Sequence, residues 1–309
     1  MSVFNQPHFH NEEAAYAFVE KRVWPNGPVC AHCGGIDRIG KLEGKSTRVG
    51  VYKCYDCRKP FTVKIGTVFE ASHVKLHLWL QAMFLMASSK KGISSNQLHR
   101  TLGVTLKTAW FMSHRLREAM KVVGMEPMGG HGVTVEVDET YFGDKELVTK
   151  RTKKGKSGLK GKRAVVALVE RNGKARSFYA PQIDKLTVRE VLEKNLHRGT
   201  ALNTDESKLY SHIAHIVKSH ESVKHAAGEY VRGEVHTNTV EGYFSIFKRG
   251  MKGIYQHCSE KHLQRYLAEF DFRYSNRIAL GVNDEARTDH MVRGIVGKRL
   301  TYETTNKGA

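Results

Sequence analysis

The sequence predicts an α/β fold that is preceded by a small cysteine-bearing module and a group of helices. Three observations carry this prediction. Two Cys-x-x-Cys pairs lie within the first 60 residues, helical patterns fill residues 75–121, and strand patterns interleaved with helical ones follow residue 132. We therefore expect separate domains at 1–66, 67–124 and 132–280, and a C-terminal tail at 281–309.

The composition favours a partner that carries many negative charges. The chain of 309 residues has 50 Lys and Arg against 31 Asp and Glu, a formal charge of +19, and 40% hydrophobic residues, as expected for a folded protein. This excess favours DNA, RNA or an anionic membrane as partner, and of these we expect DNA. The longest apolar stretch, 76–87, is shorter than the ~20 residues of a membrane span, and the N-terminus shows no secretory signal. We expect a cytoplasmic, nucleoid-associated protein whose thiols stay reduced.

The first domain combines a helix with a metal site. Residues 11–23 have an apolar helical face, and Asn11 suits the N-cap position. Free or redox-active thiols are one interpretation of the cysteines in this domain, and Cys258, far along the chain, is expected to be a core thiol. Two Cys-x-x-Cys pairs with 20 residues between them instead favour a four-cysteine structural Zn²⁺ site, with ligands Cys30, Cys33, Cys54 and Cys57.

Residues 67–124 are expected to form a helix-turn-helix DNA-binding domain. Helical patterns cover 76–88, 94–102 and 105–117, and Gly103 supplies a tight turn before the last of them. An ordinary helical connector is the alternative, because this pattern is degenerate. The side chains of the last helix that we expect to face DNA are Lys107, Thr108, His114 and Arg115.

Residues 132–280 follow the order of an α/β domain, with three strands, a helix, a strand and further helices. The strand patterns lie at 133–138, 164–169, 177–180 and 200–205, and the helical patterns at 187–196 and 209–217.

A basic segment lies between the first two of these strands. Eight of the 14 residues from 150 to 163 are Lys or Arg. We interpret the segment as an arm that follows a phosphate backbone, in preference to a merely solvated loop. The DNA-contacting residues that we expect in it are Lys153, Lys154 and Lys156.

Three acidic residues of this domain lie at positions that suggest a shared metal site. Asp138 and Asp205 end predicted strands, and Glu241 opens a predicted helix. Carboxylates at the ends of neighbouring strands point into one cleft, where hard oxygen ligands suit Mg²⁺ or Mn²⁺. Two such ions drive cleavage and transfer of phosphodiesters. A capping or surface role is the alternative for each residue, and Glu136, on the same sheet face as Asp138, is expected to be an accessory ligand or a salt-bridge partner.

Four stretches of the sequence resemble one family in combination. They are Trp24–Gly34 around the first cysteine pair, Val135–Gly143, His236–Gly250 and Phe270–Arg277. Over residues 10–301 the chain is similar to the DDE transposases of Merlin-related bacterial insertion sequences, the ISXO-like group. The resemblance implies an RNase H-like catalytic domain, Mg²⁺ or Mn²⁺ as catalytic ions, and a DNA transposase that cuts and joins the ends of an insertion sequence. We also expect a homo-oligomer, a dimer on DNA.

The resemblance also implies roles for individual residues. Asp138 and Asp205 match the two aspartates of the family's motif. The third position stays open between Glu241, which we prefer because a carboxylate binds Mg²⁺ better than an amide, and Asn238, which is one helical turn away. Lys248 resembles the family's trailing lysine, and with the adjacent Arg249 it is expected to hold DNA.

Two further classes of protein compete with this interpretation. One is a DNA-binding regulator with the zinc ribbon and helix-turn-helix but an inactive catalytic domain. The other is a recombinase with Tyr243 or Ser245 as nucleophile, for which the sequence lacks an accompanying cluster of Arg and His.

Overall fold

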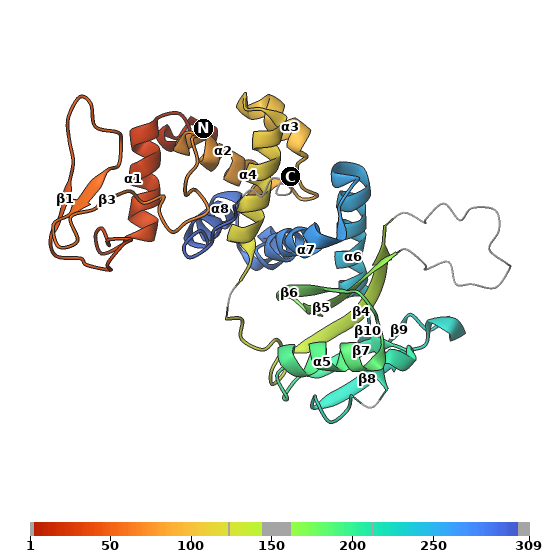
Figure 1. The fold of residues 1–309 in the computed structure, drawn as a ribbon. Coiled ribbons are helices and arrows are strands. Elements are labelled where there is room, and N and C mark those ends of the chain that lie inside the picture. Colours follow the sequence, from red (N-terminus) through yellow and green to blue (C-terminus); the bar gives the residue numbers. More distant parts are fainter. Residues whose placement is uncertain (1–2, 123, 144–161, 212, 302–309) are drawn as a thin grey trace, which may run out of the picture. The chain divides into compact units, whose positions relative to one another are not determined.

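The computed structural model describes residues 3–122, 124–143, 162–211 and 213–301. The chain forms two compact units, of which the first combines Met1–Lys121 with Val282–Ala309 and the second comprises Val122–Gly281 (Figure 1). This division differs from the expected one, because residues 67–121 share a unit with the cysteine module. No helix of the described residues is long and apolar enough to cross a membrane.

The N-terminal part of the first unit consists of a helix and a small sheet. Two 3₁₀ turns (Val3–Asn5 and Pro7–Phe9) precede helix α1 (Glu12–Val23), which begins where predicted, since the Asn11 side chain accepts a 2.9 Å hydrogen bond from the amide of Ala14. Three short antiparallel strands follow in the order β1-β2-β3, and their bounds are Ile39–Lys41, Tyr52–Cys54 and Pro60–Phe61.

The rest of the first unit is helical. Helices α2 (Leu76–Ser88), α3 (Ser95–Leu102) and α4 (Leu106–Met120) lie where the sequence predicts them. The Ser94 and Thr105 side chains cap α3 and α4, and each accepts a 3.1 Å hydrogen bond from the helix's first turn. Gly103 ends α3 with a φ of 67°, a left-handed conformation that glycine adopts without strain.

The expected C-terminal tail contributes a helix to this unit. Helix α8 (Asp284–Arg293) contacts α2, and Arg287 donates a 3.0 Å hydrogen bond to the carbonyl of Ala87 near the end of α2. Met291, Val292 and Ile295 are fully buried. One face of α8 and Ile295 are therefore part of the packed core of the unit.

A five-stranded mixed sheet forms the centre of the second unit. Its strands are ordered β6-β5-β4-β7-β8, and their bounds are Ala175–Ala180, Arg163–Glu170, Thr134–Phe142, Ala201–Asp205 and Ser219–Val223. The pairs β4–β5 and β5–β6 are antiparallel, whereas β4–β7 and β7–β8 are parallel.

Helices cover both faces of this sheet (Figure 1). Helices α6 (Asn238–Gly250) and α7 (Glu260–Ser275) pack on the face that presents Val165, Ala167 and Val169 of β5. Helix α5 (Lys185–Asn195) packs on the other face, against Val166 and Leu168. Successive strand residues alternate between faces, so the apolar run of β5 is buried on both sides.

The prediction of a helix at 209–217 is wrong. The chain makes only a 3₁₀ turn there (Lys208–Tyr210) before β8. Tyr210, Ile213 and Val217 are buried with spacings of three and four residues, which imitates a helical pattern. The β-branched residues of this segment lower its helix propensity, and their burial in the core is compatible with an irregular backbone.

Short elements that the sequence analysis missed connect β8 to α6. They are a 3₁₀ turn (His225–Ala227) and a two-stranded ribbon of β9 (Val231–Arg232) and β10 (Val235–His236). After α6, a π-helical turn (Met251–Tyr255) precedes α7, and a last 3₁₀ turn (Ile278–Leu280) follows it.

Candidate zinc site and acidic active site

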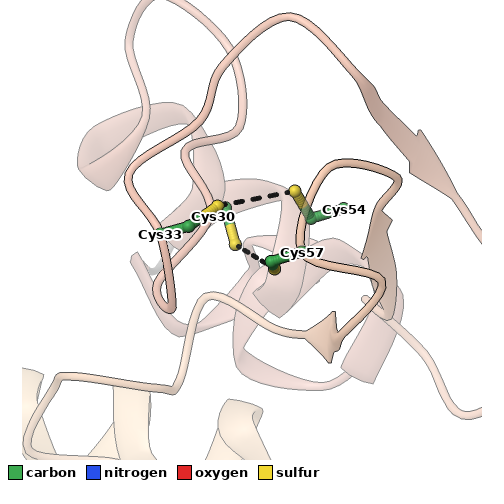
Figure 2. Close-up of side chains that lie close together, drawn as sticks. All are labelled: Cys30, Cys33, Cys54 and Cys57. Atoms are coloured by element: carbon green, nitrogen blue, oxygen red, sulfur yellow. Dashed lines mark hydrogen bonds between the residues drawn. The ribbon is translucent and has the colours of Figure 1, made fainter.

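The four cysteines of the two Cys-x-x-Cys pairs come together around one point (Figure 2). Their sulfur atoms all lie within 4.8 Å of one another, and the Cys30–Cys57 and Cys33–Cys54 sulfur pairs are 3.7 Å apart. A tetrahedral site with Zn–S bonds near 2.3 Å requires sulfur atoms about 3.8 Å apart. The geometry therefore fits zinc. His32, inside the first pair, directs Nε2 to the carbonyl of Pro60 at 3.2 Å and is not needed as a ligand.

The acidic residues of the sheet lie on its two central parallel strands. Strand β4 pairs with β7 in a register that joins Thr134 to Ala201 and Glu136 to Asn203. The paired residues end there, and the same register continued by two residues sets Asp138, in the middle of β4, opposite Asp205, the last residue of β7. The prediction that Asp138 ends a strand is wrong, because β4 continues to Phe142. Neighbouring strands are about 4.8 Å apart, so this register still brings the two carboxylates close together.

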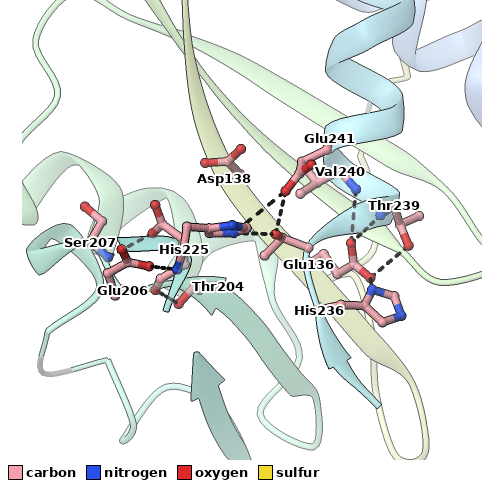
Figure 3. A network of polar contacts seen from close by, with 12 residues as sticks. Glu136, Asp138, Thr204, Glu206, Ser207, His225, His236, Thr239, Val240 and Glu241 are labelled. Carbon is pink, nitrogen blue, oxygen red and sulfur yellow. Dashed lines mark hydrogen bonds and ion pairs between the residues drawn. The ribbon is translucent and has the colours of Figure 1, made fainter. Parts of the chain in front are cut away.

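Helix α6 is fixed to β4 by a buried carboxylate (Figure 3). Glu136 is completely buried and accepts hydrogen bonds from the amides of Thr239 (2.7 Å) and Val240 (3.1 Å) and from the Thr239 hydroxyl (2.8 Å). Arg171 donates to the same carboxylate at 2.8 Å. A carboxylate at the N-terminus of a helix satisfies free amides and interacts favourably with the helix dipole. Of the two roles expected for Glu136, accessory metal ligand or salt-bridge partner, the structure shows the salt bridge. Glu136 also caps α6.

This attachment places Glu241 in the first turn of α6 near the strand carboxylates. Its side chain is 49% exposed, accepts a 2.9 Å hydrogen bond from the Thr237 hydroxyl, and lies 3.8 Å from Nε2 of His225 (Figure 3). Asn238 is the first residue of α6 and is exposed. Both candidates for the third position therefore sit at the same helix end.

Charge repulsion marks the acidic residues as one cluster. Burial, followed by the charges of Glu139, Asp205 and Glu241, raises the pKa of Asp138 to about 7. Burial and the charge of Glu206 also raise the pKa of Asp205. Among the described residues, the cysteines alone form a set of three or more potential ligands within 4.8 Å of one another. The carboxylates are thus more widely spaced, close enough to repel one another, and a divalent cation among them would relieve this repulsion.

Two residues contact these carboxylates although no sequence pattern predicts the contacts. His225 contacts Glu241 because the chain folds back through the β9–β10 ribbon, and no ligand spacing links the two. Tyr210 donates a 2.6 Å hydrogen bond to Glu139 from the segment that was predicted to be helical. Both contacts depend on irregular segments, which periodicity does not reveal.

The expected DNA-contacting residues have different surroundings. Lys107, Lys248 and Arg249 are exposed, whereas Lys153, Lys154 and Lys156 lie outside the described residues. Arg115 is 5% exposed, and its guanidinium donates to the carbonyls of Leu300, Val68 and Glu70 at 2.8–3.0 Å. His114 is 1% exposed. The expectation that Arg115 and His114 face DNA is therefore wrong, since α4 is the buried central helix of its unit and exposes chiefly its first turn.

The recombinase alternative conflicts with the surroundings of Tyr243. This side chain is 1% exposed, and its hydroxyl donates a 2.6 Å hydrogen bond to the buried carboxylate of Asp271. Burial and the charge of Asp271 raise the pKa of Tyr243 well above its usual value. A nucleophile has to be accessible and activated, and Tyr243 is neither.

Comparison with known proteins identifies both units. Residues 10–60 match the transposase zinc-ribbon domain, and residues 128–275 match the ISXO2-like transposase domain. Over 277 residues, which are 86% of this chain and 91% of the relative, the protein is 28% identical to an uncharacterised protein in transposable element ISH50 of Halobacterium salinarum. The zinc ribbon and the transposase domain together define the class of protein, which is a transposase of an insertion sequence. The chain thus carries a transposase zinc-ribbon domain and an ISXO2-like transposase domain, which confirms the resemblance found in its sequence.

Proposed function

We propose that the protein is a DNA transposase that binds the ends of an insertion sequence and carries out metal-dependent strand cleavage and strand transfer. The observation that carries this proposal is the alignment of Asp138 and Asp205 on neighbouring parallel strands, with the first turn of α6 held against the same strand by Glu136. The mixed sheet with helices on both faces supports an RNase H-like fold for this unit.

The acidic residues would hold the catalytic ions. Asp138, Asp205 and Glu241 offer hard oxygen ligands of the kind that Mg²⁺ and Mn²⁺ prefer. When bound, such ions activate the attacking oxygen and stabilise the leaving oxygen of an in-line displacement. Thr237 and His225 orient Glu241 through its Oε1 atom.

DNA recognition is assigned to the first unit and to exposed cations of the second. The zinc ribbon and the exposed first turn of α4, with Lys107, would contact the element ends, because recognition helices read DNA with their N-terminal residues. Lys248 and Arg249 on α6 would hold the phosphate backbone close to the acidic residues, as the basic arm at 150–163 would also do. We further propose that the protein acts as a dimer on DNA in the cytoplasm, at the nucleoid.

A cleavage assay separates this function from that of a DNA-binding regulator. DNA that carries the inverted repeats flanking the protein's own gene should be cut with Mg²⁺ or Mn²⁺, and only bound with Ca²⁺, which fits the octahedral in-line geometry poorly. Specific binding without cleavage under all three ions would favour the regulator and contradict the proposal.

The same assay decides whether Glu241 or Asn238 is the third catalytic residue. Glu241→Gln should abolish cleavage and leave end binding intact, whereas Asn238→Ala should cut at a reduced rate as a nearby helper. Normal cleavage by Glu241→Gln together with an inactive Asn238→Ala would assign the role to Asn238.

A further inference from the structure

A large basic pocket lies in the second unit at the end of β4. It has a volume of about 990 Å³. Among the described residues that line it there is no Asp or Glu, and four are cationic, namely Lys162, Arg163, Lys248 and Lys252. Within the described part of the chain, no ion pair joins any of the four to a carboxylate. The pocket therefore carries a concentrated positive charge that would attract an anion and repel metal ions.

The pocket depends on the π-helical turn at the end of α6. Met251 is fully buried and anchors this turn, and its carbonyl accepts a 2.8 Å hydrogen bond from the amide of Gln256. Gln256 has a φ of 55°, which reverses the chain so that residues 256–259 form a wall of the pocket. Arg163 holds this wall through a 2.6 Å hydrogen bond to the carbonyl of Cys258. Irregular turns of this type are frequent at functional sites.

Two elements connect the basic pocket with the acidic residues. Glu241 and Lys248 are seven residues apart on α6, which corresponds to about 10 Å along the helix. Asp138 and Phe142, a residue of the pocket wall, are four residues apart on β4, which corresponds to about 14 Å. Along one strand of a duplex, phosphates follow one another every 3.4 Å of helix axis, so these distances span roughly three or four phosphates.

We propose that this pocket binds the backbone phosphates of the DNA strand that is cut at the acidic residues, roughly three or four nucleotides from the reacting phosphate. The inference rests on the proposed function and adds a contact site to it. The resemblance implies Lys248, and the sequence places Lys162 and Arg163 at the end of the basic segment 150–163. The structure brings these three cations together with Lys252 in one pocket. Lysine contacts to phosphate fix position and register and carry no sequence information. The pocket thus sets where the strand lies, and other parts of the chain choose which DNA is bound.

The test compares two pairs of lysine substitutions in the full-length protein. Lys162→Ala with Lys252→Ala removes two charges from the pocket and leaves Arg163 to hold its wall. Lys185→Ala with Lys218→Ala removes two charges from exposed positions outside the pocket and serves as the matched control. Affinity for the element end is measured in Ca²⁺ over a range of salt concentrations, so that the result does not depend on cleavage.

We expect the pocket pair to lower the log–log salt slope by about 1.8, because each phosphate contact contributes about 0.9, and the control pair to leave it unchanged. Ethylation of phosphates three to four nucleotides from the cut should interfere with binding by the wild type but no longer with the pocket pair. The inference would be overturned if the two double variants showed equal salt slopes, or if ethylation still interfered with binding by the Lys162→Ala, Lys252→Ala variant. Neither result would affect the proposed function as long as the wild type cleaves DNA. A wild type that binds but never cleaves would instead overturn the proposed function.

Discussion

The carboxylate of Glu136 accepts a 2.7 Å hydrogen bond from the backbone amide of Thr239, two residues before Glu241. The bond joins the strand that carries Asp138 to the helix that carries the third acidic residue. Because Glu136 is completely buried and Arg171 neutralises it, the contact is well protected from solvent. The position of α6 relative to β4, and thus the geometry of the acidic cluster, depends on this side chain.

Glu136→Gln should therefore reduce strand cleavage by ~10- to 100-fold, the usual effect of losing a partner behind a metal ligand. An amide accepts through one oxygen only, so α6 loses part of its attachment. A shift of the Mg²⁺ dependence to higher concentrations, with unchanged end binding, distinguishes this positioning role from general unfolding. Glu221→Gln on exposed β8 is the matched control. Unaltered Mg²⁺ dependence in Glu136→Gln would refute the assignment.

The purified protein should contain about one zinc ion per chain. Cys30→Ser combined with Cys54→Ser should abolish zinc binding, because it removes one ligand from each pair and leaves only two thiolates. Cys258→Ser, which changes a buried thiol outside the cluster, should retain the metal. Elemental analysis of the three proteins checks this, and a zinc-free wild type or a zinc-loaded double variant would show that the cysteines have another role.

Arg115 and Lys107 lie on the same helix and should behave in opposite ways. Arg115→Ala leaves one buried and two partly buried carbonyls without their charged donor and should lower the free energy of unfolding by about 3 kcal/mol. Lys107→Ala should change stability by less than about 0.5 kcal/mol and weaken binding to DNA. Urea unfolding and DNA titration of both variants test this contrast. A stable Arg115→Ala protein with weak DNA binding would restore the role expected from the sequence.

Asp271 should make the stability of the protein depend on pH. Burial raises its pKa from 3.8 to about 6, against the opposing effect of hydrogen bonds from Tyr243 and Ser177. As the pH rises from 4 to 6, the unfolded chain releases this proton first, so the contribution of Asp271 to stability is present below pH 4 and is lost by about pH 6. The loss corresponds to roughly 3 kcal/mol.

The measurement compares urea unfolding of the wild type and Asp271→Asn between pH 4 and 7. The difference between their free energies of unfolding should fall across pH 4–6 and become constant above that range, because the asparagine does not titrate. A constant difference at every pH would mean that Asp271 titrates normally.

Much of the architecture could be predicted because local chemistry determines it. Asn11, Ser94 and Thr105 cap helices as their side chains suggest, and the cysteine spacing alone brings the four sulfur atoms together. The valines of β4 show their strand through alternation, and the unbroken apolar run of β5 is typical of a strand that is buried on both faces. Helix α8 was missed because its core residues, Met291 and Val292, lie in a segment with a polar average and were interpreted as a tail.

The acidic cluster was predictable only in part. Residue type and strand position pointed to Asp138 and Asp205, but the partners that orient the site come from distant segments. Glu136 acts on α6, which begins about 100 residues later, and His225 reaches Glu241 through a ribbon that has no sequence signal. Burial likewise could not be predicted for Arg115, since a basic side chain on a short helix is usually exposed.

The rate of Mg²⁺-dependent cleavage of the element ends by Asp138→Asn and Asp205→Asn tests the central claim most directly. The cleavage rate of both variants should fall by more than ~100-fold, which is the usual cost of losing a partner behind a metal ligand, because each variant loses a metal-binding carboxylate. Both variants should bind the element ends as the wild type does. Glu221→Gln, which removes an exposed carboxylate from the same sheet, should cut at the wild-type rate. Cleavage by either asparagine variant at the wild-type rate would contradict the assignment of the active site and the transposase mechanism built on it.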